Sequence, residues 1–267
     1  MRAIPRVSQS QFTYFHKLTE RKYRQRERKF LIEGVKLVQE ALSSDWRLET
    51  LLVHREFLLI EDAREILRMA ESAQSELLEI SRDELKRLAD TVTPQGIIGV
   101  VARREVQADT LFADDGKECL IVALDAISDP GNVGTMIRTC DWFGADAVVL
   151  SKNSVELSNP KTVRSTMGSL FHLPICSDVE LLQFIPTAKA KGFKVIATTL
   201  EGGKALEPAS FAKKNIVIFG SESHGVSQEI LPLADDSVKI SRFGKAESLN
   251  VGIACGIVLS AWRVSMT

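Results

Sequence analysis

The chain has 267 residues, of which 45% are hydrophobic and 26% charged, a composition typical of soluble globular proteins and long enough for two domains. This hydrophobic content excludes a disordered chain. No apolar run approaches the ~20 residues of a membrane span, and the N-terminal residues contain no apolar core of a signal peptide. Four widely separated cysteines form no C-x-x-C pair, so neither a metal site nor a disulfide framework is predicted. We therefore expect a cytoplasmic protein that holds no metal and binds no membrane.

The net charge of −1 hides a basic N-terminal segment. Residues 1–36 hold ten lysines and arginines but three acids, and aromatic residues are interleaved with them. Basic side chains neutralise phosphates and aromatic rings stack on unpaired bases, so an RNA-binding surface is one interpretation. A solvated helix with charge pairs four residues apart is the other. The candidate RNA-binding residues are Arg21, Lys22, Arg24, Arg26, Arg28 and Lys29.

The N-terminal part of the chain alternates between helix and strand patterns. Residues 11–43 are predicted as a helix interrupted near Gly34, because apolar residues recur with a helical period. The motif Ser81-x-x-Glu84 is a capping box, which opens a second helix. The remaining expected elements are a helix at 62–71 and strands at 48–53, 76–80 and 97–102.

The second half of the chain also alternates strands and helices. Strands are expected at 120–124, 147–150, 194–198, 216–219 and 238–240, and helices at 133–143, 160–167, 179–191 and 247–264. Such alternation implies a mainly parallel sheet with helices on both faces. The predicted fold is therefore α/β, with a smaller α/β domain over 1–104, a polar linker over 105–118 and the parallel-sheet domain over 119–267.

Ligands bind at the carboxyl ends of parallel strands, where three loops of unusual composition lie. In the first loop, a Pro-Gly turn precedes Asn132, which suits the N-cap of the next helix. On that helix Arg138 projects away from the apolar face, and Trp142 lies beside it. This pair indicates a subunit interface or a substrate surface. An ion pair between Arg138 and Asp141 on a solvated face is the alternative.

The second loop follows a buried strand and is bracketed by Gly220 and Gly225, with Glu222 between them. Glycines allow the backbone to approach a ligand closely. The loop matches neither the phosphate-binding P-loop nor the G-x-G-x-x-G dinucleotide motif. A tight turn with an exposed Glu222 is the alternative interpretation.

The third loop, residues 240–250, leads into a helix that is apolar nearly all round. Such a helix is predicted to be buried on every side, either centrally or in a dimer interface. Ser248 and Asn250 would then lie at its buried start, where polar groups need partners. Simple helix capping is the alternative.

Together these loops resemble the SpoU (TrmH-like) family of RNA ribose 2′-O-methyltransferases, in the SPOUT superfamily. The stretches DPGNVGTMIRTCDWFGADAVVL, FGSESHGVS and ESLNVGIACGI carry the resemblance, in order and spacing, with VRSTMGSLFHLPI between the first two. The resemblance covers residues 119–264, and residues 12–102 resemble the N-terminal substrate-binding domain of many members. The family's third motif usually has Pro-Met where Ser241-Arg242 stand, and Ser where Gly252 stands.

The resemblance implies a deep trefoil knot, bound S-adenosylmethionine, an RNA substrate and a homodimer formed through the knotted domain. The residues that it assigns to the cofactor are Thr198, Leu200, Gly220, Ile240 and Leu249. The residues that it assigns to catalysis are Asn132, Arg138, Glu222, Ser248 and Asn250. The family proposal makes Arg138 the general base. Because a guanidinium keeps its proton, we expect it instead to bind the adjacent phosphate and to stabilise negative charge on the attacking oxygen.

The expected function is methylation of a ribose 2′-hydroxyl in structured RNA. A separate RNA-binding domain favours ribosomal RNA over tRNA by analogy, so a tRNA methyltransferase is the first alternative. A non-catalytic RNA-binding protein with the same fold is the second, although a binder needs none of the polar residues assigned to catalysis. A Rossmann-type oxidoreductase is disfavoured by the missing dinucleotide motif.

Overall fold

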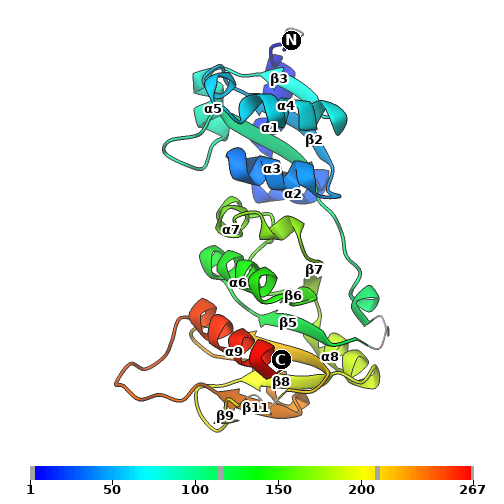
Figure 1. Cartoon of the computed structure of the whole chain (residues 1–267), viewed down its shortest axis with the longest axis vertical. Helices are drawn as coiled ribbons and strands as arrows, with labels where there is room; N and C mark the ends of the chain where they lie inside the picture. The colour runs from blue at the N-terminus through cyan, green and yellow to red at the C-terminus, as the bar shows by residue number, and fades with distance from the viewer. Residues whose placement is uncertain (1–3, 113–116, 208–210, 266–267) are drawn as a thin grey trace. The chain divides into compact units, whose positions relative to one another are not determined.

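The structure, a computed structural model, describes residues 4–112, 117–207 and 211–265 (Figure 1). The chain divides into two compact units, residues 1–104 with 158–172, and residues 105–157 with 173–267. The sequence places residues 158–172 in the second domain, whereas the structure packs them with the first unit. None of the helices within the described ranges is long and apolar enough to cross a membrane.

The first unit contains a four-stranded mixed sheet in the order β1-β4-β2-β3. Strands β1 and β2 run antiparallel to β4, and β3 runs parallel to β2. Its strands are β1 (Lys29–Glu33), β2 (Leu48–Val53), β3 (Glu76–Glu79) and β4 (Ile97–Ala102). Its helices are α1 (Gln9–Lys17), α2 (Arg21–Glu27), α3 (Val35–Ser43), α4 (Ala63–Ser72), α5 (Arg82–Leu88) and α7 (Pro160–Ser165). The predicted helix at 62–71 and the three predicted strands are confirmed.

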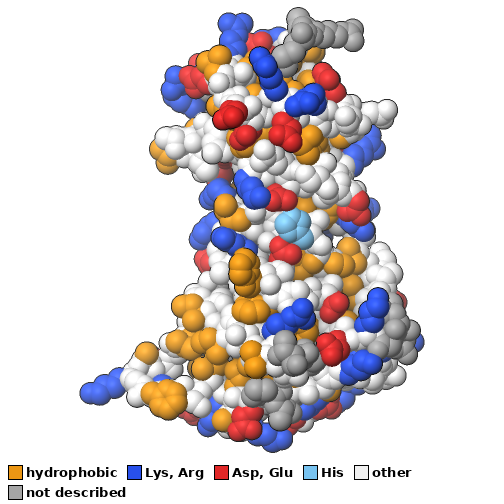
Figure 2. Space-filling model, viewed as in Figure 1, with side chains coloured by type: hydrophobic (Ala, Val, Ile, Leu, Met, Phe, Trp, Pro, Cys, Tyr) orange, Lys and Arg blue, Asp and Glu red, His pale blue; other side chains and the backbone are white. Residues whose placement is uncertain are grey.

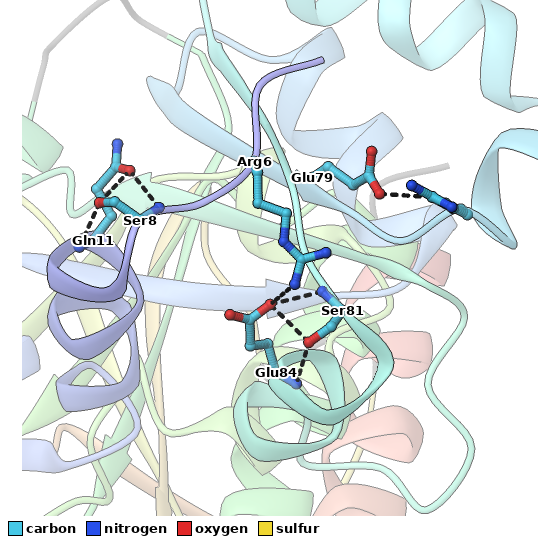
Figure 3. Close-up of polar contacts among 7 residues, drawn as sticks. Arg6, Ser8, Gln11, Glu79, Ser81 and Glu84 are labelled. Atoms are coloured by element: carbon cyan, nitrogen blue, oxygen red, sulfur yellow. Dashed lines mark hydrogen bonds and ion pairs between the residues drawn. The ribbon is translucent and has the colours of Figure 1, made fainter. Parts of the chain in front are cut away.

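Two capping boxes begin helices of this unit (Figure 3). At α1, the Ser8 hydroxyl accepts the Gln11 backbone N–H at 3.3 Å. At α5, the Ser81 hydroxyl accepts the Glu84 backbone N–H at 3.3 Å, and the Glu84 carboxylate accepts the Ser81 backbone N–H at 2.7 Å. Arg6 adds an ion pair to the same carboxylate at 3.1 Å. The helix start predicted from Ser81-x-x-Glu84 is therefore confirmed.

Residues 29–33 form strand β1 where the sequence predicts helix. Phe30 and Ile32 are buried between half-buried neighbours, which is the two-residue alternation of a strand. The strand pairs with β4 along its whole length. Gly34, at φ +100°, then turns the chain into α3. Pairing with β4 and burial of one face outweigh the local helical pattern.

The second unit is built on a seven-stranded sheet in the order β7-β6-β5-β10-β8-β11-β9. Every pair of neighbouring strands is parallel, which confirms the predicted sheet. Its strands are β5 (Cys119–Asp125), β6 (Ala147–Ser151), β7 (Ile175–Val179), β8 (Lys194–Thr198), β9 (Lys204–Ala205), β10 (Lys214–Gly220) and β11 (Asp236–Lys239). Its helices are α6 (Pro130–Phe143), α8 (Leu181–Ala190) and α9 (Val251–Ser265). Short 3-10 turns lie at 108–112 and 231–233 in this unit, and at 57–59 and 169–171 in the first unit.

Helices cover both faces of this sheet. Phe184 and Ile185 of α8 pack in one core with Ile121 of β5, Ile216 of β10 and Val195 of β8. Because side chains alternate along a strand, their neighbours point to the opposite face. Helices α6 and α9 pack against each other on that face, and α9 contacts β10. The two helices that carry predicted site residues thus lie side by side.

Candidate active site

The parallel sheet brings two of the predicted loops together. Strands β5 and β10 are neighbours, and their pairing ends at Asp125 and Gly220. The loops that follow them therefore leave the same edge of the sheet next to each other. From β5 the chain continues to β6, whereas β10 has β8 on its other side. Such a point, where strand order diverges, is the usual ligand site of an open parallel sheet.

A chain of hydrogen bonds joins one residue from each of the three predicted loops. The Asn132 amide nitrogen Nδ2 donates to the Glu222 carboxylate. The Asn250 amide nitrogen Nδ2 donates to Asn132 Oδ1 at 2.9 Å. Residues 90 and 118 positions apart in the chain thus meet through their side chains. This contact unites Asn132, Glu222 and Asn250 of the predicted catalytic set.

Asn132 does not cap its helix, contrary to the prediction. Asp129 is the N-cap of α6, and its carboxylate accepts the Asn132 backbone N–H at 2.8 Å. Pro130 occupies the first helical position, where its fixed φ and missing N–H suit a helix start. Asn132 is consequently the third helical residue. Its amide is therefore available to bond both Glu222 and Asn250.

Asn250 has two roles at the start of α9. Its Oδ1 accepts the backbone N–H groups of Gly252 at 2.9 Å and Ile253 at 3.3 Å, while its Nδ2 bonds Asn132. These bonds fix which end of the amide faces the site. Helix α9 begins at Val251 and not at Glu247, and residues 241–250 are exposed in the single chain, so the predicted start of this helix is not buried centrally in the fold. Ile253 and other apolar residues of α9 are also exposed, so the helix is not buried on every side in the chain alone.

The other two predicted catalytic residues stand apart from this chain of hydrogen bonds. Arg138 and Ser248 are exposed, and the side chain of neither residue makes a hydrogen bond or ion pair with any residue that the structure describes. The alternative ion pair of Arg138 with Asp141 is therefore absent among those residues. Trp142 is 84% exposed. The Arg138 and Trp142 side chains thus present a free cation and a free aromatic ring on the exposed side of α6.

Asp125 is a site residue that the sequence interpretation missed. It is 7% exposed, and its carboxylate accepts the Ser227 backbone N–H at 2.9 Å, which ties down the far end of the second loop. The near end is closed by the Gly225 backbone N–H, which donates to Ser221 O at 2.8 Å. A Cβ at Gly220 would lie 1.9 Å from the Gly225 carbonyl carbon, so this fold-back needs glycine. The sequence did contain a signal for Asp125, because it is an acidic residue at the end of the buried strand that leads into the first of the three loops.

The predicted cofactor residues gather at the ends of three adjacent strands. Thr198 ends β8, Gly220 ends β10 and Ile240 follows β11, in the strand order β10-β8-β11. The Thr198 hydroxyl donates to Ile218 O at 3.0 Å, which holds β8 against β10. Leu200 and Leu249 are exposed large apolar side chains on the loops that flank this edge.

These residues fit a nucleoside cofactor. The hydroxyl of Thr199, in the same stretch, is buried and has no hydrogen-bond partner within the described ranges. A buried unpaired hydroxyl is costly and is satisfied by a polar ligand group. The two exposed leucines offer apolar surface to an adenine ring, and the strand ends offer backbone groups. Burial and contact with the Cys255 thiol raise the pKa of the Cys140 thiol on α6 well above its usual value, so Cys140 does not compete as a nucleophile here.

The basic N-terminal residues separate into two groups. Arg24 is 5% exposed and its guanidinium donates to Leu18 O and to Thr19 O at 2.7 Å, so it closes the turn between α1 and α2. The prediction that Arg24 contacts RNA is therefore corrected. Lys29 pairs with Glu49 at 2.6 Å, and this hydrogen bond raises the pKa of Lys29.

The exposed group surrounds an aromatic ring. Lys17, Lys22 and Arg26 each place their charge within 6 Å of the Tyr23 ring centroid, at 5.6, 5.7 and 4.8 Å. Arg26 also pairs with Glu27 at 2.8 Å. Arg21 and Arg28 are exposed as well. This cluster has the composition of an RNA-binding surface.

Comparison with known proteins identifies the family. Residues 119–260 match the SpoU rRNA Methylase family, and residues 10–99 match the MRM3-like substrate binding domain. A 23S rRNA (guanosine(2553)-2′-O)-methyltransferase, RlmP of Bacillus subtilis, is 34% identical over 259 residues, covering 97% of this chain and 98% of the relative. A 23S rRNA (uridine(2479)-2′-O)-methyltransferase of Streptomyces viridochromogenes is 30% identical, over 91% of this chain and 85% of the relative.

Solved structures agree with these relatives over both units. The AdoMet-bound rRNA methyltransferase of Sinorhizobium meliloti aligns with a TM-score of 0.85 and 28% identity, over 99% of this chain and 98% of the other. The SpoU methyltransferase AviRb of Streptomyces viridochromogenes, in complex with AdoMet, aligns with a TM-score of 0.85 and 27% identity, over 97% and 98%. The chain therefore belongs to the SpoU rRNA methylase family, and it is an S-adenosylmethionine-dependent RNA ribose 2′-O-methyltransferase.

Proposed function

We propose that this protein methylates one ribose 2′-hydroxyl of ribosomal RNA, with the reaction centred on the hydrogen-bonded residues Glu222, Asn132 and Asn250. The observation that carries the proposal is that these bonds join three separate loops at the strand ends beside the candidate cofactor residues. Relatives that match nearly the whole chain are named as 23S rRNA methyltransferases, which favours ribosomal RNA over tRNA. A protein acting on bacterial ribosomes would work in the cytoplasm.

The residues have separable tasks in this proposal. S-adenosylmethionine, when bound by Thr198, Leu200, Gly220, Ile240 and Leu249, supplies a methyl group on a positively charged sulfur. Glu222 fixes the Asn132 amide, and Asn132 in turn orients the ribose hydroxyl toward that methyl group. Arg138 binds the neighbouring phosphate and stabilises the negative charge that grows on the attacking oxygen, and the hydroxyl proton would pass to water as the oxygen takes the methyl group from sulfur. Ser248, which is exposed next to Leu249, is left to contact the substrate or the cofactor.

Methyl transfer to separate RNA pools tests the proposed substrate. Purified full-length protein is incubated with S-adenosylmethionine labelled in its methyl group and with total rRNA or total tRNA. We expect label in the rRNA pool and none in the tRNA pool. Label in tRNA would contradict the rRNA assignment. Calorimetric cofactor binding without label in either pool would contradict the use of mature RNA and leave an assembly intermediate as the substrate.

A homodimer through the exposed side of α6 and α9 forms part of this proposal, as does a trefoil knot in the parallel-sheet unit. Trp142, Ile253 and Ile257 are exposed apolar residues of these two helices. Figure 2 shows hydrophobic side chains gathered over α6 and α9. A second copy would cover this surface, and such contiguous apolar patches mark interfaces. It would also place a partner surface next to Arg138, whose side chain makes no hydrogen bond or ion pair within the described ranges.

The dimer predicts a specific effect of charge on α9. In sedimentation velocity, the wild type is expected to run as a dimer, and Ile257→Asp is expected to weaken association more than tenfold, because a buried unpaired carboxylate is costly. Leu59→Asp is the matched control, since Leu59 is an exposed apolar residue of the first unit. A monomeric wild type, or equal dissociation by both variants, would contradict the interface.

The basic cluster around Tyr23 predicts a salt effect on RNA binding. Replacing Arg21, Lys22 and Arg26 together by alanine removes three exposed charges and should lower the slope of log affinity against log salt by roughly two to three. Filter binding of the full-length protein to 23S rRNA at several KCl concentrations measures this slope. Arg24→Ala is the matched control: it should loosen the turn after α1 and leave the slope unchanged. An equal slope change in both variants would contradict the assignment.

A further inference from the structure

The loop between β11 and α9 is exposed to an unusual degree. Residues 241–250 are ten consecutive exposed residues, and the ring of Phe243 is 97% exposed. The loop projects away from the sheet in Figure 1, where it is drawn in orange before α9. Figure 2 shows hydrophobic and basic side chains at its tip. Phe243 therefore buries nothing in its own chain and contributes no packing to the fold.

Two cations accompany this ring. The Arg242 guanidinium donates to Ala246 O at 3.5 Å within the loop, and the Lys245 side chain bonds none of the residues that the structure describes. Neither cation is paired with an acid in those residues. Glu247 lies at the end of the loop nearer α9 and is also exposed. An aromatic ring between two unpaired cations is the combination that holds unpaired nucleotides, with the ring stacking on a base and the cations contacting phosphates.

Both ends of the loop belong to the candidate active site. Ile240 precedes it among the cofactor residues, and Asn250 follows it in hydrogen-bond contact with Asn132. Phe243 is three residues along the chain from Ile240, so its backbone lies within about 10 Å of that cofactor residue. A ribose hydroxyl in stacked RNA is difficult to reach, and unstacking one nucleotide exposes the base of its neighbour. A free phenyl ring beside the site can replace the lost stacking partner.

From these observations we propose that Phe243 stacks on the unpaired base of a nucleotide adjacent to the methylated one, while Arg242 and Lys245 contact the flanking phosphates. The inference rests on the proposed RNA methyltransferase function and names the feature of the substrate that this loop reads. A second copy of the chain is the competing occupant of the loop. Lysine is depleted in protein interfaces, which disfavours burying Lys245 in one, and the exposed helical residues Trp142 and Ile257 already provide an apolar interface elsewhere.

Binding of a short unpaired RNA tests the proposal. The probe is a fluorescein-labelled oligoadenylate of about 12 nucleotides, and a hairpin of fully paired RNA of the same length is the comparison. Fluorescence anisotropy with the full-length protein is expected to show about tenfold weaker oligoadenylate binding for Phe243→Ala, because the variant loses the ring on which a base stacks. Phe243→Trp should bind at least as tightly as the wild type. Binding of the paired RNA should change less than threefold in both.

The cations are tested by salt dependence. Arg242→Ala combined with Lys245→Ala should lower the salt slope for oligoadenylate by about one to two, while Phe243→Ala leaves it unchanged. Equal oligoadenylate affinity of Phe243→Ala and wild type would overturn the proposal. Dissociation of the dimer by Phe243→Ala in sedimentation velocity would overturn it in favour of a subunit contact.

Failure of this inference is distinguishable from failure of the proposed function. If the wild type methylates rRNA and Phe243→Ala binds and methylates it normally, the inference alone is wrong. If the wild type methylates no RNA but loses oligoadenylate binding on Phe243→Ala, the stacking site stands and the proposed function is wrong.

Discussion

Replacing Arg138 by alanine is expected to lower the rate of methyl transfer about a thousandfold while changing S-adenosylmethionine affinity less than twofold. The guanidinium is exposed and bonds nothing in the described part of the chain, so its loss leaves the fold and the cofactor residues intact. What disappears is the positive charge beside the oxygen that becomes negative as it attacks. Single-turnover rates at saturating cofactor, together with calorimetric cofactor binding, measure the two effects separately.

Arg138→Lys decides between a cationic role and a general-base role. A lysine keeps a positive charge below its usual pKa of about 10.4. If the charge acts, the ratio of the Arg138→Lys rate to the wild-type rate should stay constant from about pH 6 to 9. A base would have to lose its proton first, so over a pH range where the wild-type rate is already level, the rate of Arg138→Lys, and with it the ratio, would rise about tenfold per pH unit toward the lysine pKa. A rising ratio would contradict the phosphate and oxyanion role that we assign.

The second large effect is expected from Asn132→Asp, which should lower kcat/KM about a hundredfold. The substitution preserves shape but removes the amide that donates to Glu222, and it brings two carboxylates within hydrogen-bond distance. The loop that begins at Gly220 should then separate from α6. Hydrogen exchange of residues 220–227 and the methyl-transfer rate report these two consequences.

A double variant is the matched control for this result. In Asn132→Asp combined with Glu222→Gln, the new glutamine amide can donate to the new aspartate, and Asn250 Nδ2 can still donate to the same carboxylate. We expect hydrogen-exchange protection of residues 220–227 to return to within about threefold of the wild type. Protection that stays as low as in Asn132→Asp alone would show that the hydrogen bonds in the structure do not hold the loop.

The parallel sheet and the positions of its loops were predictable because they depend on local patterns. Buried strands alternating with amphipathic helices occur in the printed sequence, and a parallel sheet necessarily places the three loops on one edge. The meeting of Asn132 with Glu222 and Asn250 depends on the order of strands β5, β10 and β8, which no local pattern contains. A resemblance to a family groups these residues, but it does not say which of them touch.

The errors also have physical causes. The sequence favours Asn132 as a helix cap because asparagine is a good N-cap, but Asp129 is equally good and is followed by Pro130 at the first helical position. Strand β1 was missed because a five-residue strand between two helices is specified by its partner β4 and not by its own period. Strand β7 was missed beside α8 for the same reason.

The sequence does not predict which single charged residue of a basic run is buried. From Arg21 to Lys29, six of the nine residues are basic, and nothing local marks Arg24 as the one that bonds the turn after α1. That contact depends on the turn between two short helices. The same holds for the start of α9, where the exposed residues 247–250 continue an apparently helical sequence and Asn250 alone marks the true boundary.

The most direct test of the account is the chemical position of the transferred methyl group. rRNA labelled by the wild-type protein is hydrolysed with alkali, which cleaves after every ribose that keeps its 2′-hydroxyl. The account predicts that the label is recovered in a single alkali-resistant dinucleotide, and that Arg138→Ala produces none in the same time. Label recovered in mononucleotides would place the methyl group on a base and would contradict the ribose 2′-O chemistry assigned to Glu222, Asn132, Asn250 and Arg138.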